Sequence, residues 1–511
     1  MNAKLRQQLQ KRNRQIRRRI DKHQGVFQSP AIRATTTKFE LSEKVQAISC
    51  GGIGIIMQMV KQLGLRKHIN QAVPILKMHL PYDEADQVLN IAMNLLAGGT
   101  CLEHLELRRT DEAYLNALGA ERIPDPTTAG DFCRRFDSIK IMERMEGIHA
   151  ARQKVWKQQP AEFFDQATIE ADGTMVETYG EKKQGIGINY KKQWGYHPLV
   201  VTLAETQELL YIANRGGNRP SHENSAIYFN SAIDLCKEAG FRKIRLRGDT
   251  DFSSTTHLDR WDRDGVTFVL GYDANKTLVG IADLLDESAW ETLSRQKPKP
   301  EKERAKRPNF KEKIVVANGY ENQILQGESY AEFDYRPVAC DRSYRMIVVR
   351  KDIQVMRGQQ HLFDKTKYFF YITNELPEDV PAREVIRHGN QRCNQENTIS
   401  QGKACGALTA PLDTLESNWA YMVMASLAWT LKLWSGMLVR VKGNPGQRKV
   451  REALRRKVIW MEFSTYLNSL MLIPAQVIRS ARQLKLRLLA YRPSVDCLLT
   501  LSDHIAMPLR C

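Results

Sequence analysis

The spacing of apolar residues predicts a helical N-terminal region followed by a mixed α/β segment. Between residues 41 and 155, apolar side chains such as Ile53, Ile56 and Val60 recur three or four positions apart, which is typical of one face of an α-helix. From residue 160 the pattern changes to short apolar runs separated by polar helical stretches. We expect strands at 167–176, 196–204, 209–214, 243–247 and 266–271, and helices at 221–238 and 257–264. This order predicts a sheet with helices packed on it.

The remaining chain divides into a β-rich part and a helical part. Strands are expected at Lys313–Val316, Tyr330–Val338, Arg345–Arg350 and Tyr368–Thr373, and the pattern from 376 to the end predicts helices. The apolar segment Trp419–Leu431 is too short for a bilayer span of about 20 residues, so it predicts a buried helix. We expect Trp419, Trp429 and Trp434 in the core, whereas Trp194 and Tyr196 suit either the core or a surface that faces DNA.

The charge of the chain favours an anionic partner. The sequence has 511 residues, too many for a single core, and 76 Lys and Arg against 58 Asp and Glu, a net charge of +18. Eleven bases lie within 1–40, including Arg17, Arg18 and Arg19, and eight lie within Arg440–Lys457. Such clusters are typical of proteins that bind nucleic acid. The N-terminal arm is either a phosphate-contacting segment or a solvated tail.

The cysteines and the N-terminus indicate a cytoplasmic protein that binds no membrane. Nine Cys are scattered without a C-x-x-C pair, a pattern that suits a reducing compartment and gives no zinc motif. Charges recur throughout the first 22 residues, so they do not form a signal peptide.

Three acids stand out because of their position relative to predicted elements. Asp172 ends the first predicted strand, Asp249 follows the fourth, and Glu396 lies on a predicted helix. Carboxylates at the C-terminal ends of neighbouring strands converge, and a hard divalent cation such as Mg²⁺ relieves their repulsion. Two such ions about 3.5–4 Å apart favour in-line phosphoryl displacement. Asp251 and Glu170 are competing acids, since a strand places Asp249 and Asp251 on one face.

The helix around Glu396 also places cations beside the acid. At about 100° per residue, Arg392, Glu396 and Lys403 fall within roughly 40° of one another. A metal-binding acid flanked by two cations suits a polyanionic substrate, although an ordinary solvated face with an Arg–Glu pair has the same pattern.

The segments that carry these residues resemble bacterial insertion-sequence transposases of the DDE type. The matching pieces are A-D-G-T at 171–174, R-G-D-T-D-F at 247–252 and R-x-x-x-E-x-x-x-x-x-x-K at 392–403. The last contains most of the Y-R-E-K signature of one large branch of these enzymes, and N-R-G-G-N at 214–218 resembles a segment between the first two acids. The resemblance covers roughly 165–275 and 375–435.

The resemblance implies an RNase H-like α/β fold. Its mixed sheet would carry helices on both faces, be interrupted by a β-rich insertion, and be flanked by helical N- and C-terminal regions. The domains we expect are a basic DNA-contacting arm (1–40), a helical region (41–158), the catalytic core (159–275 and 373–436), the β-rich insertion (276–372) and a basic helical C-terminal region (437–511). The helical region is either a DNA-end-binding domain or a plain helical scaffold.

The resemblance also implies the activity. A DNA transposase would bind the terminal inverted repeats of its element, cleave strands and transfer them into target DNA, using Mg²⁺ with Mn²⁺ as a substitute. Its partners would be double-stranded DNA and a second copy of the chain, in the bacterial cytoplasm at the nucleoid. The alternatives are an RNase H-like nuclease without joining activity and a catalytically silent DNA-binding regulator.

Residue by residue, the resemblance assigns catalysis and metal binding to Asp172, Asp249 and Glu396, and contacts with DNA ends to Arg392 and Lys403. The basic clusters add further candidates for DNA binding: Arg17, Arg18, Arg19, Arg134, Arg135, Arg448 and Lys449. We place Arg134 and Arg135 on a helix that begins at Pro126-Thr127-Thr128.

The chain departs from the signature at one position. The signature tyrosine falls on Gly389, so its phosphate contact is missing or is supplied by His388. The resemblance favours Asp172 and Asp249 over Glu170 and Asp251.

Overall fold

The computed structural model describes residues 3–21, 45–78, 80–253, 255–295, 314, 317–357, 360–391, 393–480, 483–490, 492 and 494–509. The chain forms two compact units. We call Met1–Phe163, Gly173–Arg219 and Asn397–Cys511 the helical unit, and Phe164–Asp172 with Pro220–Glu396 the sheet unit. Each unit is described by itself.

The sheet unit contains a large mixed sheet whose strands run in the order β10-β11-β12-β13-β9-β8-β2. Its strands are β2 (Gln166–Gly173), β8 (Lys243–Gly248), β9 (Val266–Tyr272), β10 (Glu291–Thr292), β11 (Glu321–Tyr335), β12 (Tyr344–Arg357) and β13 (Gln360–Thr373). Its helices are α9 (Ser225–Ala239), α10 (Leu258–Arg263), α11 (Lys276–Leu284), α13 (Ala382–Asn390) and the first turn of α14 (Cys393–Ala404). Strands β2, β8 and β9 are parallel, and the others pair antiparallel.

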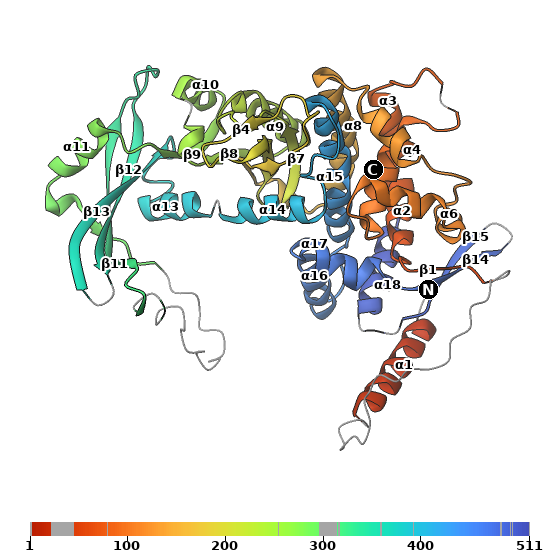
Figure 1. Cartoon of the computed structure of the whole chain (residues 1–511). Coiled ribbons are helices and arrows are strands. Elements are labelled where there is room, and N and C mark those ends of the chain that lie inside the picture. Colours follow the sequence, from red (N-terminus) through yellow and green to blue (C-terminus); the bar gives the residue numbers. More distant parts are fainter. Residues whose placement is uncertain are drawn as a thin grey trace. The chain divides into compact units, whose positions relative to one another are not determined.

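Helices cover both faces of this sheet. Figure 1 shows α9 and α10 on one side of β8 and β9, and α13 on the other. The apolar residues Ala382, Val385 and Ile386 of α13 recur at helical spacing and pack against Val269 of β9 and Ile347 of β12. This contact positions the end of α13, and with it the start of α14, over one face of the sheet.

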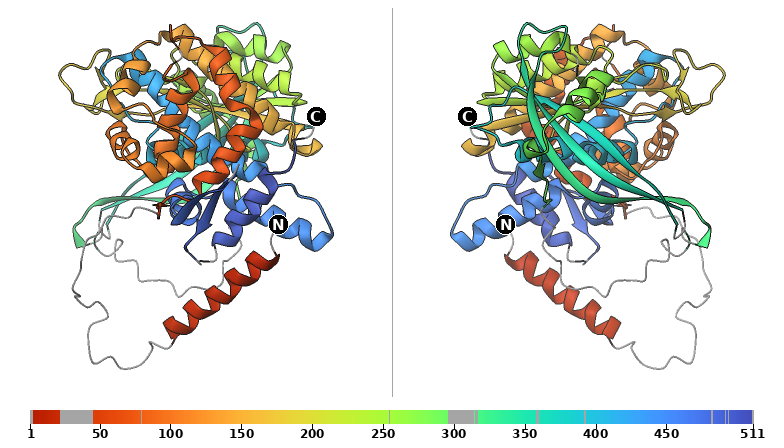
Figure 2. Two further views of the ribbon diagram at one scale, coloured as in Figure 1. Left: turned by 90° about the vertical axis from the view of Figure 1, so that its right-hand side faces the viewer. Right: turned by 90° about the vertical axis from the view of Figure 1, so that its left-hand side faces the viewer.

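Three long strands extend the sheet into a ribbon. Only Phe370–Thr373 of β13 pair with β9, whereas β12 pairs with β11 and β13 along nearly its whole length. The ribbon is seen along its length in Figures 1 and 2. The predicted strands at Tyr330–Val338, Arg345–Arg350 and Tyr368–Thr373 lie largely within it. The strand predicted at Lys313–Val316 lies outside the described residues, except for Ile314, which is helical.

The helical unit is built around the buried helix α15 (Leu415–Met437). The other helices are α1 (Ala3–Asp21), α2 (Ile53–Leu63), α3 (Leu65–Ala72), α4 (Glu84–Leu96), α5 (Leu105–Arg109), α6 (Glu112–Leu118), α7 (Pro126–Cys133), α8 (Ser138–Trp156), the remainder of α14, α16 (Pro445–Ile459), α17 (Phe463–Tyr466) and α18 (Ser494–Ile505). The unit also holds the short strands β3 (Val176–Glu177), β4 (Gly187–Ile188) and β5 (Trp194–Tyr196) and the predicted hairpin of β6 (Leu199–Leu203) and β7 (Glu208–Ala213). No described helix is long and apolar enough to cross a membrane.

A buried carboxylate ties α8, β7 and α15 together. Glu208 is fully buried and accepts hydrogen bonds from the indole nitrogens of Trp156 and Trp434, each at 2.8 Å. It also accepts from Nε of Arg152 at 3.0 Å and from Oγ1 of Thr206 at 2.8 Å. Four donors satisfy the buried charge, so Glu208 is a structural acid.

The tryptophans divide between core and surface. The expected core positions of Trp419, Trp429 and Trp434 are confirmed, since all three are buried. For Trp194 and Tyr196 the sequence allowed either a core position or a surface that faces DNA. In the structure Tyr196 is buried, whereas Trp194 is 46% exposed.

The prediction of helices from 376 to the end is wrong for one segment. Strands β14 (Ala475–Ser480) and β15 (Gln483–Leu488) form a hairpin, and β14 also pairs with β1 (Ala47–Ile48). The alternation of Leu484, Leu486 and Leu488 with polar residues has the period of a strand.

Candidate active site

The site is built on a register shared by neighbouring strands of the sheet unit. Glu170 of β2 pairs with Arg247 of β8, and Arg247 pairs with Val269 of β9. Paired residues of adjacent strands point to the same face of a sheet. Because Val269 packs against α13, this row of side chains lies on the face that α13 covers.

Asp172 and Asp249 come next along these two strands. Each follows a member of the Glu170–Arg247 pair, the last pair that β2 and β8 form, by two residues. Asp172 lies within β2, whereas Asp249 follows the end of β8 and caps the turn Thr250–Phe252. Because adjacent strands lie roughly 4.8 Å apart, we expect the two aspartates near each other at the carboxyl ends of β2 and β8. Both are half-buried.

The two competing acids have other environments. Glu170 is 1% exposed and accepts a 2.6 Å hydrogen bond from Nε of Arg247, itself 4% exposed. Strand β8 ends at Gly248, and a 3₁₀ turn at Thr250–Phe252 follows, so the strand period that grouped Asp249 with Asp251 does not apply. Asp251 is exposed, and its backbone N–H donates to Oδ1 of Asp249 at 3.0 Å. Glu170 therefore anchors a cation, and Asp251 belongs to the turn.

A glycine that the sequence analysis missed lets this turn fold over the sheet. Gly271 of β9 lies in the same row as Asp249, and a Cβ atom there would come within 3.0 Å of the carbonyl carbon of Asp249 and 2.9 Å of the backbone nitrogen of Thr250. Backbone atoms cannot yield as a flexible side chain does, so the missing side chain of Gly271 is needed for the position of Asp249.

Glu396 lies on the first turn of α14, which begins near this face. Nη1 of Arg247 donates to the backbone oxygen of His388 and to Oε1 of Gln391, both at 3.2 Å. The ion pair beneath the aspartates thus holds the end of α13, five residues before Glu396. Glu396 is exposed. Among the described residues, no three His, Cys, Asp or Glu side chains gather closely enough to hold a metal ion, so the three acids do not form such a group here.

The space beside Gly389 of α13 is filled by a tyrosine from strand β13. A Cβ atom on Gly389 would clash with Cε1 of Tyr371, and Tyr371 pairs with Gly271 of β9. The neighbouring His388 is half-buried, and burial, followed by the nearby Arg245 and Arg387, lowers its pKa to about 4. His388 is therefore neutral at pH 7 and unsuited to serve as a cationic phosphate ligand.

The predicted DNA-contacting residues have varied environments. Arg392 lies outside the described residues. Lys403 of α14 donates from Nζ to the backbone oxygen of Met175 at 2.8 Å, and burial lowers its pKa against the opposing effect of Glu177. Arg17 and Arg18 are exposed on α1, and Arg448 and Lys449 are exposed on α16; Arg19 lies on α1.

The expectation that Arg134 and Arg135 lie on the helix beginning at Pro126 is wrong. Helix α7 ends at Cys133, Arg134 is its C-cap, and the N-cap is Asp125, whose side chain accepts from the N–H of Thr128. Arg134 donates to Asp413 at 2.9 Å and to Asp131 at 2.8 Å. Two ion pairs hold Arg134, whereas Arg135 is exposed.

Comparison with known proteins gives one family and a distant structural likeness. Residues 43–508 match the model of the family described as transposase DDE domain group 1. No curated protein matches. Among solved structures, the chain is similar to a piggyBac transposase in a synaptic complex with hairpin DNA, at 10% identity and a TM-score of 0.34 over 83% of this chain and 84% of that one.

Proposed function

The chain belongs to the transposase DDE domain group 1 family, and from this premise we propose that it binds the terminal inverted repeats of its own element, cleaves DNA strands there and joins them to target DNA. The single observation that supports this chemistry best is the parallel pairing of β2 with β8, whose last pair, Glu170 with Arg247, comes two residues before Asp172 and Asp249 respectively. The turn that Gly271 admits directly after β8 begins at Asp249.

The donor set suits a hard divalent cation. Carboxylate oxygens are the ligands that Mg²⁺ prefers, and two adjacent carboxylates repel each other without a cation. Asp172 and Asp249 would hold Mg²⁺, or Mn²⁺ in its place, and Glu396 would complete the set. When bound, the ion would supply Lewis-acid stabilisation of the phosphoryl oxygens and lower the pKa of a bound water.

The proposed reaction needs no external energy source. In the first step water displaces a 3′-oxygen from phosphorus, and one P–O bond breaks as another forms. In the second step the freed 3′-OH attacks a phosphodiester of target DNA, and one phosphodiester replaces another. The carboxylates would hold the cation, Arg392 and Lys403 would hold the reacting phosphate, and proximity would supply much of the rate enhancement.

Cations of the chain would hold the DNA. Arg392 and Lys403 are the proposed contacts with the element end, and Arg17, Arg18, Arg19, Arg135, Arg448 and Lys449 are proposed contacts with phosphates. Arg134 would first have to leave its two carboxylate partners, at little cost, because exposed ion pairs contribute only about 0–1 kcal/mol. We further propose that two copies act on paired ends in the bacterial nucleoid.

The test compares two neighbouring acids on DNA that carries the element end. Asp249→Asn should abolish Mg²⁺-dependent cleavage and leave end binding intact, whereas Asp251→Asn should cut within a few-fold of the wild-type rate. Equal cleavage by both variants would remove Asp249 from the mechanism. Pre-cleaved ends separate the alternatives: cutting without joining would identify a nuclease, and neither reaction would identify a silent regulator.

A further inference from the structure

A cavity in the helical unit has the features of a binding site that the proposed reaction does not use. It measures about 360 Å³ and is lined by residues from α2, the segment after α8, the end of α15, α16 and α18. This volume falls at the lower end of the range of about 300–1,000 Å³ typical of small-molecule sites. It suits one nucleotide unit and is too small for a duplex.

Three arginines that line the cavity form no ion pair with an acid of the described chain. Arg440 and Arg455 are half-buried and Arg448 is exposed, and none of the three forms a salt bridge in the described part of the chain. Nη2 of Arg455 donates to Oε1 of Gln159 at 2.6 Å, a neutral acceptor. Burial, opposed by Glu452, lowers the pKa of Arg455. A half-buried cation that forms no ion pair favours an anion beside it.

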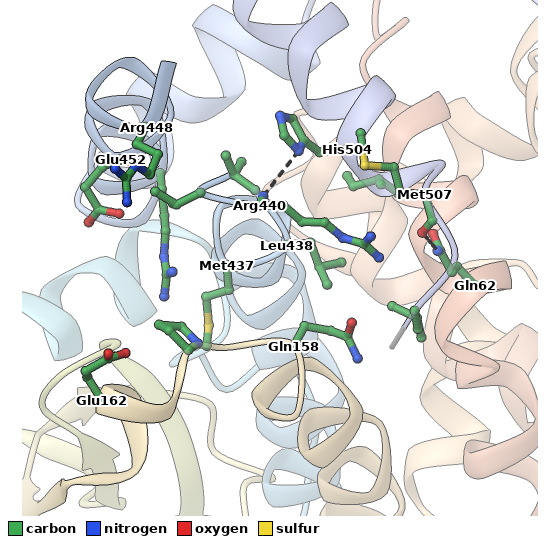
Figure 3. A pocket seen from close by; sticks show the side chains of 16 residues that line it. Gln62, Gln158, Glu162, Met437, Leu438, Arg440, Arg448, Glu452, His504 and Met507 are labelled. Carbon is green, nitrogen blue, oxygen red and sulfur yellow. Dashed lines mark hydrogen bonds between the residues drawn. The ribbon is translucent and has the colours of Figure 1, made fainter. Parts of the chain in front are cut away.

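The hydrogen bond from Arg455 to Gln159 fixes the position of the guanidinium. Gln159 is buried, and its Nε2 donates to the backbone oxygens of Val155 at 2.7 Å and Met437 at 3.3 Å. A fixed donor loses little entropy when it binds a ligand, so Arg455 is preorganised toward the cavity. On the opposite side, the backbone N–H of Arg440 donates to Nδ1 of His504 at 3.2 Å, as Figure 3 shows.

The wall between these cations is apolar. Met437 and Leu438 line it, with Ile505 and Met507 from the C-terminal end of the chain. Figure 3 shows Arg448 on one side of the cavity and Met507 on the other, with Met437 and Leu438 between them. The two acids of the lining, Glu162 and Glu452, are exposed. An apolar wall beside arginines suits a ligand with a flat or apolar part and a phosphate.

We propose that this cavity binds one unpaired nucleotide of a DNA strand. Its phosphate would lie against Arg448 and Arg455, and its base or sugar against Met437 and Leu438. Single-stranded nucleic acid is held by the same combination of cations and surfaces on which a base packs. The assignment of DNA as the source rests on the proposed function, whereas the preference for a nucleotide phosphate rests on the cavity itself.

The experiment uses the full chain and two labelled probes, a blunt duplex and the same duplex with a four-nucleotide single-stranded extension. Wild type should bind the extended duplex about tenfold more tightly, the scale of one charge-assisted contact. Arg455→Gln and Arg448→Gln should each reduce this preference severalfold. Arg456→Gln removes the same charge from the same helix without touching the cavity, and it should keep the preference.

The measured quantity is the ratio of the affinity for the extended duplex to the affinity for the blunt duplex. A general loss of positive charge weakens binding to both probes and leaves this ratio unchanged. Arg448 has no hydrogen-bonding partner in the described residues whose loss would unfold the chain, and it serves as the second variant if Arg455→Gln is unstable. An equal effect of all three variants, or no effect of any, would overturn the proposal. Neither result depends on cleavage. If the chain prefers the extended duplex but never cuts DNA, the proposed transposase mechanism fails and the proposed role of the cavity stands.

Competition by small probes identifies the source and the chemistry of the ligand. Thymidine 5′-monophosphate should displace the extended duplex more effectively than inorganic phosphate does. Equal competition by inorganic phosphate would reduce the cavity to a plain anion site and overturn the nucleotide assignment. Tight binding of the mononucleotide without any preference for the extension would assign the cavity to free nucleotides and overturn the role of the strand.

Discussion

Glu170 and Arg247 form a buried ion pair directly beneath the two aspartates of the candidate site. Nε of Arg247 lies 2.6 Å from Oε1 of Glu170, and the same guanidinium donates to the backbone oxygen of His388 and the side chain of Gln391. One cation thus joins β2, β8 and the end of α13, the helix that precedes α14 and Glu396 in the chain.

Breaking this pair should be costly. In Glu170→Gln the buried guanidinium loses its carboxylate, and removing one partner of a buried pair typically costs about 3–5 kcal/mol. Thermal or urea unfolding of the variant measures this loss. Asp165→Asn is the matched control, because it breaks the exposed pair with Arg242 near the start of the same two strands, for which about 0–1 kcal/mol is expected. Equal destabilisation by both variants would contradict the anchoring role of Glu170.

Gly271→Ala should reduce activity more than stability. The added methyl group meets the backbone of Asp249 and Thr250, so the turn must shift and the carboxylate of Asp249 moves with it. Because a displacement of about 1 Å can cost about 100-fold in rate, we expect a loss of cleavage of that order with DNA binding retained. Gly280→Ala on α11 is the control, since nothing lies within 4 Å of its Cβ position. Cleavage by Gly271→Ala at the wild-type rate would show that the turn tolerates the shift.

The buried Lys432 should make stability depend on pH. Burial lowers its pKa from 10.5 to about 7, so the unfolded chain holds a proton between these values that the folded chain does not. Stability therefore rises with pH from about 7 to 10.5, and the cost of burying the ammonium is greatest below pH 7. Lys432→Met removes this dependence, although it also loses the hydrogen bond from Nζ to Ile459.

The measurement is the difference in unfolding free energy between wild type and Lys432→Met across this range. Relative to the variant, wild type should gain up to a few kcal/mol between pH 7 and pH 10, since one pKa unit corresponds to about 1.4 kcal/mol. Other titrating groups contribute to both proteins and cancel in the difference. A difference that stays constant with pH would show that Lys432 titrates normally.

Binding to DNA should weaken steeply with salt. Each phosphate contact contributes a slope of about −0.9 in a plot of log K against log salt concentration. If Arg17 and Arg18 on α1 each contact a phosphate, Arg17→Gln with Arg18→Gln should reduce the magnitude of the slope by about 1.8. Asp131→Asn serves as the control, because it removes a negative charge and frees Arg134 from one ion-pair partner, whereas the double variant removes two positive charges. An unchanged slope in the double variant would assign the N-terminal arm to solvent.

The amino-acid sequence by itself determined the local elements and the candidate chemistry. Strands β2, β8 and β9 and helix α15 follow from apolar runs within each segment, because periodicity is a local property of the chain. Asp172, Asp249 and Glu396 were identified from short motifs for the same reason. The hairpin of β14 and β15 does not follow from the helical pattern predicted for 376–511, although Leu484, Leu486 and Leu488 alternate with polar residues at the period of a strand.

The tertiary structure alone decided that Glu170 is a structural anchor and that Asp251 belongs to a turn. Glu170 became an anchor because Arg247, 77 residues later, pairs with it across two parallel strands. Asp249 was separated from Asp251 because β8 ends where Gly271 of the next strand admits a turn. The space at Gly389 was filled by Tyr371 for the same physical reason: contacts between segments distant in the chain depend on strand register and helix packing, which no local pattern encodes.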